Sequence, residues 1–297
     1  MKKVTVIGGS GFLGSYVADE LTKRGYDVLI ADIKNSIHLK KPQRFMLCDI
    51  TDPSSLEAVV NDSSIVYNFA GLADIDESNK LPREAIEQNV IGNLNILEAC
   101  KGRELERFVY ASSAYALSTK GGVYGISKLA SEKIVEEYSR RHDLQFTIIR
   151  YGSLYGERAG KNNGVYKMLR DALTTQTIHH YGDGEQVREY IHASDAAALS
   201  VDILEDDKYV NQHSILTGVE RMRQRDILRM IQEVMNCEIK IIYSDKKHAS
   251  HYEVTPYSYQ PNNARKLVCN SFIDLGQGLL SCISHIDSEL NKGTDEK

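Results

Sequence analysis

The segment Val4-Thr5-Val6-Ile7-Gly8-Gly9-Ser10-Gly11-Phe12-Leu13-Gly14 decides the fold of this 297-residue chain. Its apolar beginning is typical of a buried parallel strand, and the glycines that follow permit a tight turn. Apolar residues at helical spacing then run to about Lys23, and Gly25 is a suitable residue to end the helix. A second apolar run, residues 27–31, ends at Asp32. A dinucleotide-binding unit requires this order, in which a strand, a glycine turn, a helix and a second strand are followed by an acidic residue.

Each part of this unit has a physical task in holding a dinucleotide. The glycines let the backbone approach a pyrophosphate, and the helix N-terminus presents free N–H groups and a positive dipole. Asp32 can accept hydrogen bonds from the adenosine ribose and would repel a 2′-phosphate. We therefore expect NAD as the cofactor, in preference to NADP. The alternative is a glycine turn in a flavodoxin-like fold that binds another ligand.

Apolar strands and amphipathic helices continue to alternate after Asp32. Strands are expected at about 44–48, 65–69, 107–111 and 145–150, and helices at about 53–60, 83–101 and 124–142. This alternation predicts an α/β protein with a doubly wound parallel sheet, the Rossmann fold, whose ligand lies at the carboxyl ends of the strands. Asp49 follows one such end, where it is either a ligand contact or a simple turn or helix-cap residue.

The pattern changes after Tyr151. Residues 152–164 read as a long polar loop, and from about Gly218 the pattern is that of a smaller α+β substrate domain. Strands are expected at about 178–181, 187–192, 214–216 and 238–242, and helices at about 165–173, 195–204, 224–235 and 275–290. The dinucleotide-binding domain would comprise 1–152 and about 191–217, and the substrate domain about 153–190 and 218–297. Residues 248–263 are expected to form a loop, either over a cleft or on the surface.

Composition excludes several classes of protein. A charged fraction of 26% with a net charge of −5 gives no clustered basic surface for nucleic acid. No apolar run reaches the ~20 residues of a membrane span, and no signal peptide precedes the first strand. The five cysteines are scattered without metal-ligand spacing, so we expect buried thiols, no metal site and a cytoplasmic location.

A candidate catalytic set lies at Tyr124-Gly125-Ile126-Ser127-Lys128. Four residues apart on a helix, Tyr124 and Lys128 share a face. A free tyrosine has a pKa near ~10, and an adjacent ammonium favours the phenolate, which can take a proton from a hydroxyl whose carbon loses hydride. Ser113, at the end of the preceding strand, is expected across the cleft to hold the reacting oxygen. Taken alone, Ser113, Tyr124 and Lys128 could be surface or helix-capping residues. Because they follow a nucleotide-binding unit in the chain, they predict a catalytic site.

These motifs resemble the extended short-chain dehydrogenase/reductases of the NAD-dependent nucleotide-sugar epimerase/dehydratase family. The resemblance is continuous to about Leu216 and specifies the family but no substrate. The matching segments are Gly8 to Gly14, Asp32, Asp49-Ile50, Phe69-Ala70-Gly71, Asn89 to Leu97, Ala111-Ser112-Ser113-Ala114, Tyr124 to Lys128, Arg150 to Gly156 and Gly182 to Asp195.

The resemblance implies a role for each matching residue. Tyr124 would be the base, Lys128 would lower its pKa and hold the nicotinamide ribose, and Ser113 would orient the reacting oxygen. The residues that would contact NAD are Gly8, Gly11, Phe12, Leu13, Gly14, Asp32, Ile33, Asp49, Ile50, Phe69, Ala70, Gly71, Asn89, Tyr124, Lys128, Tyr151 and Ser153. The sugar nucleotide would contact Ser113, Asn163, Arg188 and Arg265.

Arg188 is expected to bind the diphosphate of the sugar nucleotide, because a guanidinium fork suits phosphate oxygens. Its alternative is a surface ion pair with Glu185 or Glu189. His192 is expected to be structural, before a helix. Members of this family pair through the helices equivalent to residues 83–101 and 124–142, which implies a homodimer.

Differences from the sequence motifs of the family narrow the set of reactions that we expect for this chain. Ala114, Tyr115 and Ala116 stand where dehydratases carry an acidic pair, and the glutamate of the decarboxylases is missing, so neither reaction is expected. The segment between Ser113 and Tyr124 is shorter than in common sugar epimerases. We expect oxidation and reduction at a sugar hydroxyl, at C4, of a nucleoside-diphosphate sugar by a 4-epimerase, with a C4 dehydrogenase or ketosugar reductase left open. A non-catalytic NAD-binding sensor or scaffold is the alternative from another class.

Overall fold

The computed structural model describes residues 1–236, 238–244, 251, 253–254, 265–269 and 271–292. Most of the predicted loop at 248–263 lies outside these residues. The chain divides into two compact units, the first of which contains Met1–Tyr151, Ala196–Leu216 and the strand Arg265–Leu267. The described parts of Gly152–Asp195, Thr217–Thr255 and Val268–Lys297 form the second. In the part of the chain that the structure describes, none of the helices has the length and apolar character needed to cross a membrane.

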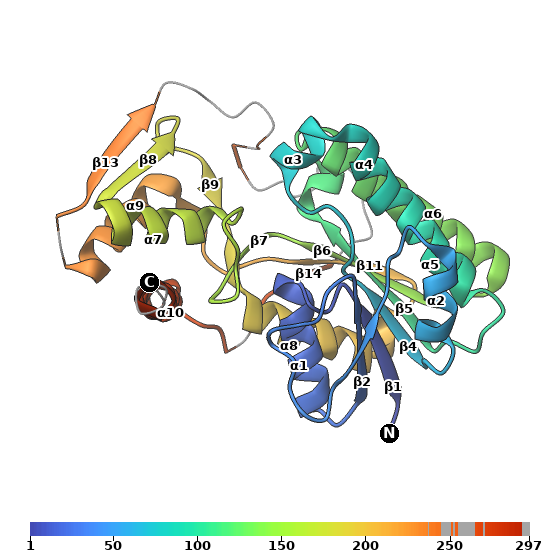
Figure 1. Cartoon of the computed structure of the whole chain (residues 1–297). Coiled ribbons are helices and arrows are strands. Elements are labelled where there is room, and N and C mark those ends of the chain that lie inside the picture. The colour runs from blue at the N-terminus through green and yellow to red at the C-terminus, as the bar shows by residue number, and fades with distance from the viewer. Residues whose placement is uncertain (237, 245–250, 252, 255–264, 270, 293–297) are drawn as a thin grey trace. The chain divides into compact units, whose positions relative to one another are not determined.

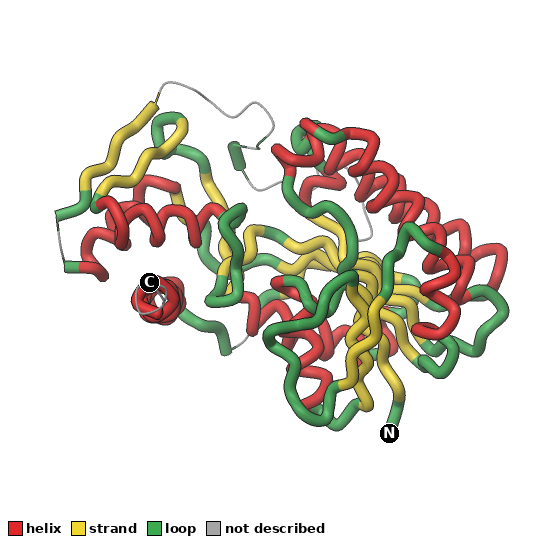
Figure 2. The backbone as a smooth tube through the Cα atoms, viewed as in Figure 1, coloured by secondary structure: helices red, strands yellow, loops and turns green. Residues whose placement is uncertain are grey.

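A parallel sheet of eight strands forms the first unit, in the order β14-β11-β6-β5-β4-β1-β2-β3. The strands are β1 (Lys3–Ile7), β2 (Asp27–Asp32), β3 (Arg44–Leu47), β4 (Ile65–Asn68), β5 (Arg107–Ser113), β6 (Phe146–Tyr151), β11 (Gln212–Leu216) and β14 (Arg265–Leu267). The order reverses between β1 and β4, and such a reversal marks the place where doubly wound sheets bind ligands. The predicted Rossmann fold is confirmed (Figure 2).

Helices cover both faces of this sheet, which is why its central strands are apolar on both sides. Every residue of β4, β5 and β6 is buried, whereas the edge strand β3 is largely exposed. In Figure 1, α1 and α8 lie together on one face, and α2, α5 and α6 lie on the other. These helices are α1 (Phe12–Lys23), α2 (Pro53–Val60), α5 (Gly92–Cys100), α6 (Gly122–His142) and α8 (Ala193–Glu205).

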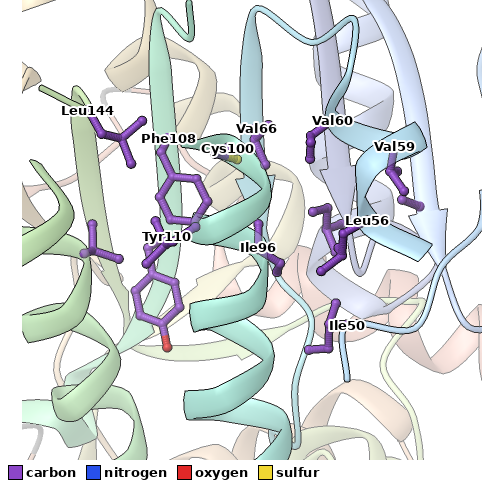
Figure 3. Packing of buried hydrophobic residues seen from close by; sticks show 14 of the residues in the cluster. Ile50, Leu56, Val59, Val60, Val66, Ile96, Cys100, Phe108, Tyr110 and Leu144 are labelled. Atoms are coloured by element: carbon purple, nitrogen blue, oxygen red, sulfur yellow. The ribbon is translucent and has the colours of Figure 1, made fainter. Parts of the chain in front are cut away.

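The core of the first unit lies between the sheet and α2, α5 and α6 (Figure 3). Leu56 of α2, Ile96 of α5 and Phe108 of β5 have no exposed surface. Burying each such side chain contributes about 1.5–3 kcal/mol to folding. Tyr110 belongs to the same cluster, and Figure 3 shows its ring next to that of Phe108.

The predicted helix over residues 83–101 is present from Pro82 to Cys100, and a π-turn that the sequence did not indicate interrupts its regular α period. The chain forms α3 (Ile75–Lys80), α4 (Pro82–Ile86), a wide π-turn η1 (Glu87–Ile91) and then α5. A π-turn contains one extra residue, and such turns mark sites where a side chain is redirected. Here the buried side chain is Asn89, which binds the loop after β4 and the helix α6. That tertiary contact overrides the local helical period.

The second unit is a small α+β fold, as predicted. Its elements are β7 (Ser153–Tyr155), α7 (Gly164–Thr175), β8 (Thr177–Tyr181), β9 (Val187–Arg188), β10 (Tyr190–His192), β12 (Met222–Arg223), α9 (Gln224–Met235), β13 (Lys240–Ser244) and α10 (Leu275–Lys292). Its core joins α7, α9 and α10 through Leu169, Ile231 and Leu279, all without exposed surface. Gly278 permits close approach, because a Cβ there would lie 2.3 Å from the hydroxyl of Tyr155.

Two local predictions in this unit are wrong. The supposed loop 152–164 contains β7, which pairs with β10 in parallel. The expected strand at 187–192 is divided into β9 and β10 at Glu189, whose buried carboxylate accepts a hydrogen bond from Thr217. Both deviations follow from pairing with distant segments, which a local apolar pattern does not encode.

Candidate active site

The glycine turn after β1 is built for close backbone contacts. Gly8 has a φ of +77°, and a Cβ there would lie 2.5 Å from the backbone nitrogen of Ala70. A Cβ on Gly14 would lie 2.3 Å from the carbonyl oxygen of Gly8, so any side chain would separate α1 from the turn. Gly11 caps α1, and only the Gly8 oxygen lies within 4 Å of its would-be Cβ, at 3.2 Å. The backbone at Gly11 is therefore open to a ligand such as a pyrophosphate.

Asp32 lies against this turn at the end of β2. Its carboxylate accepts the backbone N–H of Ser10 at 3.0 Å, and the Ser10 hydroxyl donates to the carbonyl of Lys34 at 2.8 Å. A carboxylate has about four acceptor positions, so this contact leaves capacity for ribose hydroxyls. Ile33, next to it, is 65% exposed. The glycine turn, the helix N-terminus and the half-buried acid together fit a dinucleotide.

The segment after β3 holds Asp49 and Ile50. The Asp49 carboxylate accepts the N–H and the hydroxyl of Thr51, at 2.9 and 2.7 Å. Asp49 is thus engaged in a local turn, one of the two interpretations that the sequence left open. Ile50 is buried and lies so close to Gly92 that a Cβ there would meet it at 2.5 Å. Its carbonyl accepts a hydrogen bond from Asn95 at 2.9 Å.

The loop after β4 is fixed by Asn89. The carboxamide oxygen of Asn89 accepts the N–H of Leu72 at 2.7 Å, and its nitrogen donates to the Leu72 carbonyl and to the hydroxyl of Ser127. Gly71 has a φ of +134°, and its would-be Cβ meets the Asn89 oxygen at 2.3 Å. Asn89 therefore fixes the loop at Leu72, next to Gly71, while Asn68 accepts the N–H of Ala70.

Aromatic rings line the neighbouring strand ends. The Phe69 ring stacks on Tyr67 at 5.8 Å between centroids and lies 6.2 Å from the ring of Tyr151. The Tyr151 hydroxyl is 2.7 Å from that of Ser200 on α8. Tyr151 is buried, and its position at the end of β6 is set by these contacts.

Ser113 ends β5, and Tyr124 and Lys128 lie in the first two turns of α6. The Ser113 hydroxyl accepts the N–H of Tyr115 at 3.2 Å, and the Tyr115 ring packs edge-on against that of Tyr124, 6.3 Å between centroids. The Lys128 ammonium lies 6.0 Å from the centroid of the Tyr124 ring and donates to the carbonyl of Ala111 at 2.9 Å. Ala111 lies two residues before Ser113, so Lys128 is bonded to the same end of β5 that carries Ser113.

Burial changes the acid–base properties of Lys128. Its ammonium lies over two tyrosine rings, 5.1 Å from the centroid of Tyr110 and 6.0 Å from that of Tyr124. Burial lowers the pKa of Lys128 from 10.5 to about 8, opposed by the nearby carboxylate of Glu132. The amine thus keeps its charge at neutral pH but exchanges its proton more readily than an ordinary lysine. Such a group suits a site where protons move.

The start of α6 depends on a tight turn. Gly121 and Gly122 have φ values of +90° and +54°. Asn79 of α3 accepts the N–H of Val123 at 3.0 Å and so caps the helix. A Cβ on Gly121 would meet the Tyr115 ring at 2.7 Å. The short segment after Ser113, which includes the 3-10 turn η2 (Ala114–Leu117), is thereby packed directly beside Tyr124.

Three of the expected site residues, Ser153, Asn163 and Arg188, belong to the second unit. Asn163 caps α7 by accepting the N–H groups of two residues of its first turn, and it donates to the carbonyl of Leu154. Arg188 is 8% exposed and donates to the carbonyls of Val187 and Glu253. Arg265, expected to bind substrate, begins β14 in the first unit.

His192 caps a helix. Its Nδ1 accepts the N–H of Ser194 in the first turn of α8, at 3.3 Å. Its side chain is 3% exposed, and Nε2 lies 3.4 Å from a carboxylate oxygen of Glu157. This position agrees with the structural role expected for it.

A buried polar network lies next to the candidate catalytic residues and was not predicted from the sequence. Glu132 of α6 binds Arg150 of β6 and Ser112 of β5, and His213 of β11 lies 3.8 Å away. The signal was present, since Glu132 follows Lys128 by one helical turn and therefore shares its face.

Known proteins resemble this chain over most of its length. It is 28% identical to a putative UDP-glucose 4-epimerase of Methanocaldococcus jannaschii, covering 93% of this chain and 95% of that one. It is 29% identical to a UDP-N-acetyl-alpha-D-glucosaminuronate decarboxylase of Bacillus cytotoxicus, covering 89% and 88%.

The fold is shared with the UDP-glucuronic acid 4-epimerase of Bacillus cereus, solved in complex with UDP-glucuronic acid and NAD. The TM-score is 0.85 at 22% identity, over 97% of this chain and 99% of that one. The model of one family, described as the NAD dependent epimerase/dehydratase family, matches residues 4–217. This match spans more than half of the 297-residue chain. The chain therefore belongs to the NAD dependent epimerase/dehydratase family, whose cofactor is NAD.

Proposed function

We propose that this protein is a 4-epimerase that oxidises and then reduces C4 of a nucleoside-diphosphate sugar. One observation carries the proposal: the buried Lys128 ammonium lies over the rings of Tyr110 and Tyr124 and is bonded to β5 two residues before Ser113. A buried cation beside a phenol, at the carboxyl edge of a Rossmann sheet, is the arrangement that makes tyrosine an effective base.

Each residue of the set has one task in this reaction. Tyr124 accepts the proton of the C4 hydroxyl, and the Lys128 ammonium stabilises the phenolate. Ser113 donates a hydrogen bond to the oxygen as its proton leaves and as carbonyl character develops. Bound NAD supplies the hydride chemistry. In the return direction Tyr124 gives the proton back, so an epimerase needs no other acid.

NAD would contact the glycine turn after β1 and the carboxyl ends of the neighbouring strands. Gly8, Gly11 and Gly14 with the N-terminus of α1 would hold the pyrophosphate, and Asp32 the adenosine ribose. The remaining expected contacts are Phe12, Leu13, Ile33, Asp49, Ile50, Phe69, Ala70, Gly71, Asn89, Tyr151 and Ser153. The sugar nucleotide would be bound by Asn163, Arg188 and Arg265, with Arg188 at the diphosphate.

Other reactions of the family are less well supported. Residues 114–123, which join Ser113 to Tyr124, include no Asp or Glu. Dehydration needs an additional acid to expel a hydroxyl, and this segment offers none. The epimerase names of the M. jannaschii relative and the B. cereus structure support the proposal, whereas the B. cytotoxicus relative keeps decarboxylation as the reaction to be tested against it.

The test is product analysis with defined sugar nucleotides. The NAD-loaded protein is incubated with UDP-glucose, UDP-N-acetylglucosamine and UDP-glucuronate, and products are separated by anion-exchange chromatography while nicotinamide absorbance is followed. A 4-epimerase forms the C4 epimer with no net NADH. Stoichiometric NADH would establish a dehydrogenase, and a pentose product with released carbon dioxide a decarboxylase.

A ketosugar reductase would consume NADH when it is offered the 4-keto sugar nucleotide. The absence of any turnover, with NAD still bound, would favour the non-catalytic sensor or scaffold. The pair Tyr124 and Lys128 argues against that class, because a sensor has no need of a buried ammonium beside a phenol.

A homodimer in the cytoplasm is also proposed. Ile86 of α4, Ile91 of η1, and Ile126 and Leu129 of α6 are 36–63% exposed on helices that pack together. An apolar face of this kind favours pairing with a second copy. Light scattering is expected to report a dimer, and Ile126→Glu a monomer. The four cysteines in the described residues are free thiols, as a reducing compartment maintains them.

A further inference from the structure

A carboxylate in the middle of α6 is sealed from solvent. Glu132 has no exposed surface. It follows Tyr124 by two turns and Lys128 by one, so the three side chains share one face of the helix. Arg150 of β6 binds both carboxylate oxygens, with Nε 2.9 Å from Oε1 and Nη2 2.6 Å from Oε2. Ser112 of β5 donates its hydroxyl to Oε1.

The partners of Glu132 adjoin the site. Ser112 precedes Ser113 on β5, and Arg150 precedes Tyr151 on β6. The two strands pair in register here, with Ser112 opposite Arg150 and Ser113 opposite Tyr151. Glu132 therefore joins α6 to β5 at Ser112 and to β6 at Arg150. Each of these two residues directly precedes an expected site residue of its strand, Ser113 or Tyr151.

Stability alone does not account for this network. Desolvating two charges costs several kcal/mol per ion, and apolar replacements of buried pairs are often equally stable. Among the described residues, Nη1 of Arg150 has no hydrogen-bond partner. A buried pair that is incompletely satisfied and sits beside a proposed catalytic face suggests a functional task.

We propose that Glu132 is a positioning residue, which fixes α6 against β5 and β6 so that Tyr124 and Lys128 face Ser113. The inference rests on the proposed function, because it assigns Glu132 to the same reaction. Its carboxylate also offsets the cost of holding the Lys128 ammonium in a dry site. Lys128 faces Tyr110 from β5, and Tyr124 and Glu132 from its own helix.

The first test separates positioning from stability. Glu132→Gln and Arg150→Met each leave one partner buried and unpaired, and we expect melting temperatures to fall by about 10 °C. The double variant Glu132→Leu/Arg150→Met removes both charges and is expected to regain most of that loss. Its kcat is nevertheless expected to stay about 100-fold below wild type, since small misplacements of reacting groups have effects of that size.

KM for the sugar nucleotide is expected to remain within about twofold of wild type in the double variant, since the diphosphate contacts proposed above do not involve Glu132. Glu136→Gln is the matched control, one turn further along α6, where Glu136 pairs with His213 at 3.0 Å. It is expected to keep wild-type kcat. If the double variant recovers kcat together with its melting temperature, Glu132 has only a structural role and the proposal is overturned.

The second test needs no turnover. Phenolate absorbance is measured against pH for the wild type and the double variant, each minus the same protein carrying Tyr124→Phe. We expect the Tyr124 phenolate to form at higher pH in the double variant, because Lys128 holds its charge less firmly there. An unchanged titration would refute the coupling. If the wild type converts no sugar nucleotide, the proposed function fails, and this titration still decides the role of Glu132.

Discussion

The two halves of α6 place similar side chains in opposite surroundings. In the first half, Tyr124, Lys128 and Glu132 are buried against β5 and β6. In the second half, Glu137 forms ion pairs with Arg140 and Arg141, whose side chains are 72% and 70% exposed. The hydrogen bond from Arg141 and the charge of Arg140 lower the pKa of Glu137. Water screens the interactions between these surface charges.

The comparison shows that the surroundings of a charge, more than its identity, decide what it can do. Burial lowers the pKa of Lys128 from 10.5 to about 8, close to physiological pH. The following predictions test that contrast, beginning with the largest expected effect.

Tyr124→Phe removes the proposed base and keeps the ring that packs on Tyr115. We expect kcat to fall about 1,000-fold, because general acid–base catalysis contributes 10²–10⁴. NAD affinity, measured by calorimetry, is expected to change less than twofold. Turnover that persists at the wild-type rate would remove Tyr124 from the mechanism.

Lys128→Met replaces the buried ammonium with an apolar side chain of similar length. The folded state lowers the pKa of Lys128 from 10.5 to about 8, so burying the protonated amine costs about 3 kcal/mol at pH 7. The lost hydrogen bond to Ala111 offsets about 1 kcal/mol. We expect the variant to be about 2 kcal/mol more stable at pH 7 by urea unfolding, and to lose most of its activity.

The pH dependence of that stability gain has a definite sign. Below pH 8 both the folded and the unfolded wild type carry the Lys128 proton, and the penalty is complete. Between pH 8 and 10.5 only the unfolded chain holds it, so wild-type stability rises with pH relative to Lys128→Met. A constant difference from pH 7 to pH 10 would contradict the burial of a charged lysine.

Asn79→Ala removes the cap of α6 just before Tyr124. Loss of the bond to the N–H of Val123 is expected to cost about 1 kcal/mol in thermal unfolding and to lower kcat several-fold. Asp52→Ala is the matched control, since Asp52 caps α2 through the N–H of Ser54. It is expected to cost as much stability with kcat unchanged.

Glu137→Gln lies in the exposed half of α6 and is expected to have the smallest effect. Because solvent screens this carboxylate and its two arginines, we expect no measurable change in melting temperature or in kcat. A clear loss of activity would show that charge along the whole of α6, and not its buried half alone, supports the site.

Much of this arrangement was predictable from local patterns. The β1 turn, Asp32 and the helix from Tyr124 to His142 were found in the predicted places, with α6 beginning two residues earlier at Gly122. Apolar runs, glycines and helical spacing are local quantities, and they suffice for elements and their order. The π-turn at Asn89 and the division of 187–192 were missed because contacts with residues distant in sequence decide them.

By itself, the sequence determined the Rossmann order of elements, the glycine turn with its acid, and the shared helical face of Tyr124 and Lys128. Only the tertiary structure decided that this face is buried, that the Lys128 ammonium lies over the rings of Tyr110 and Tyr124, and that Glu132 is paired with Arg150. The reason is physical. Spacing tells which residues point the same way, whereas burial and charge pairing depend on the strands that the fold brings beneath them.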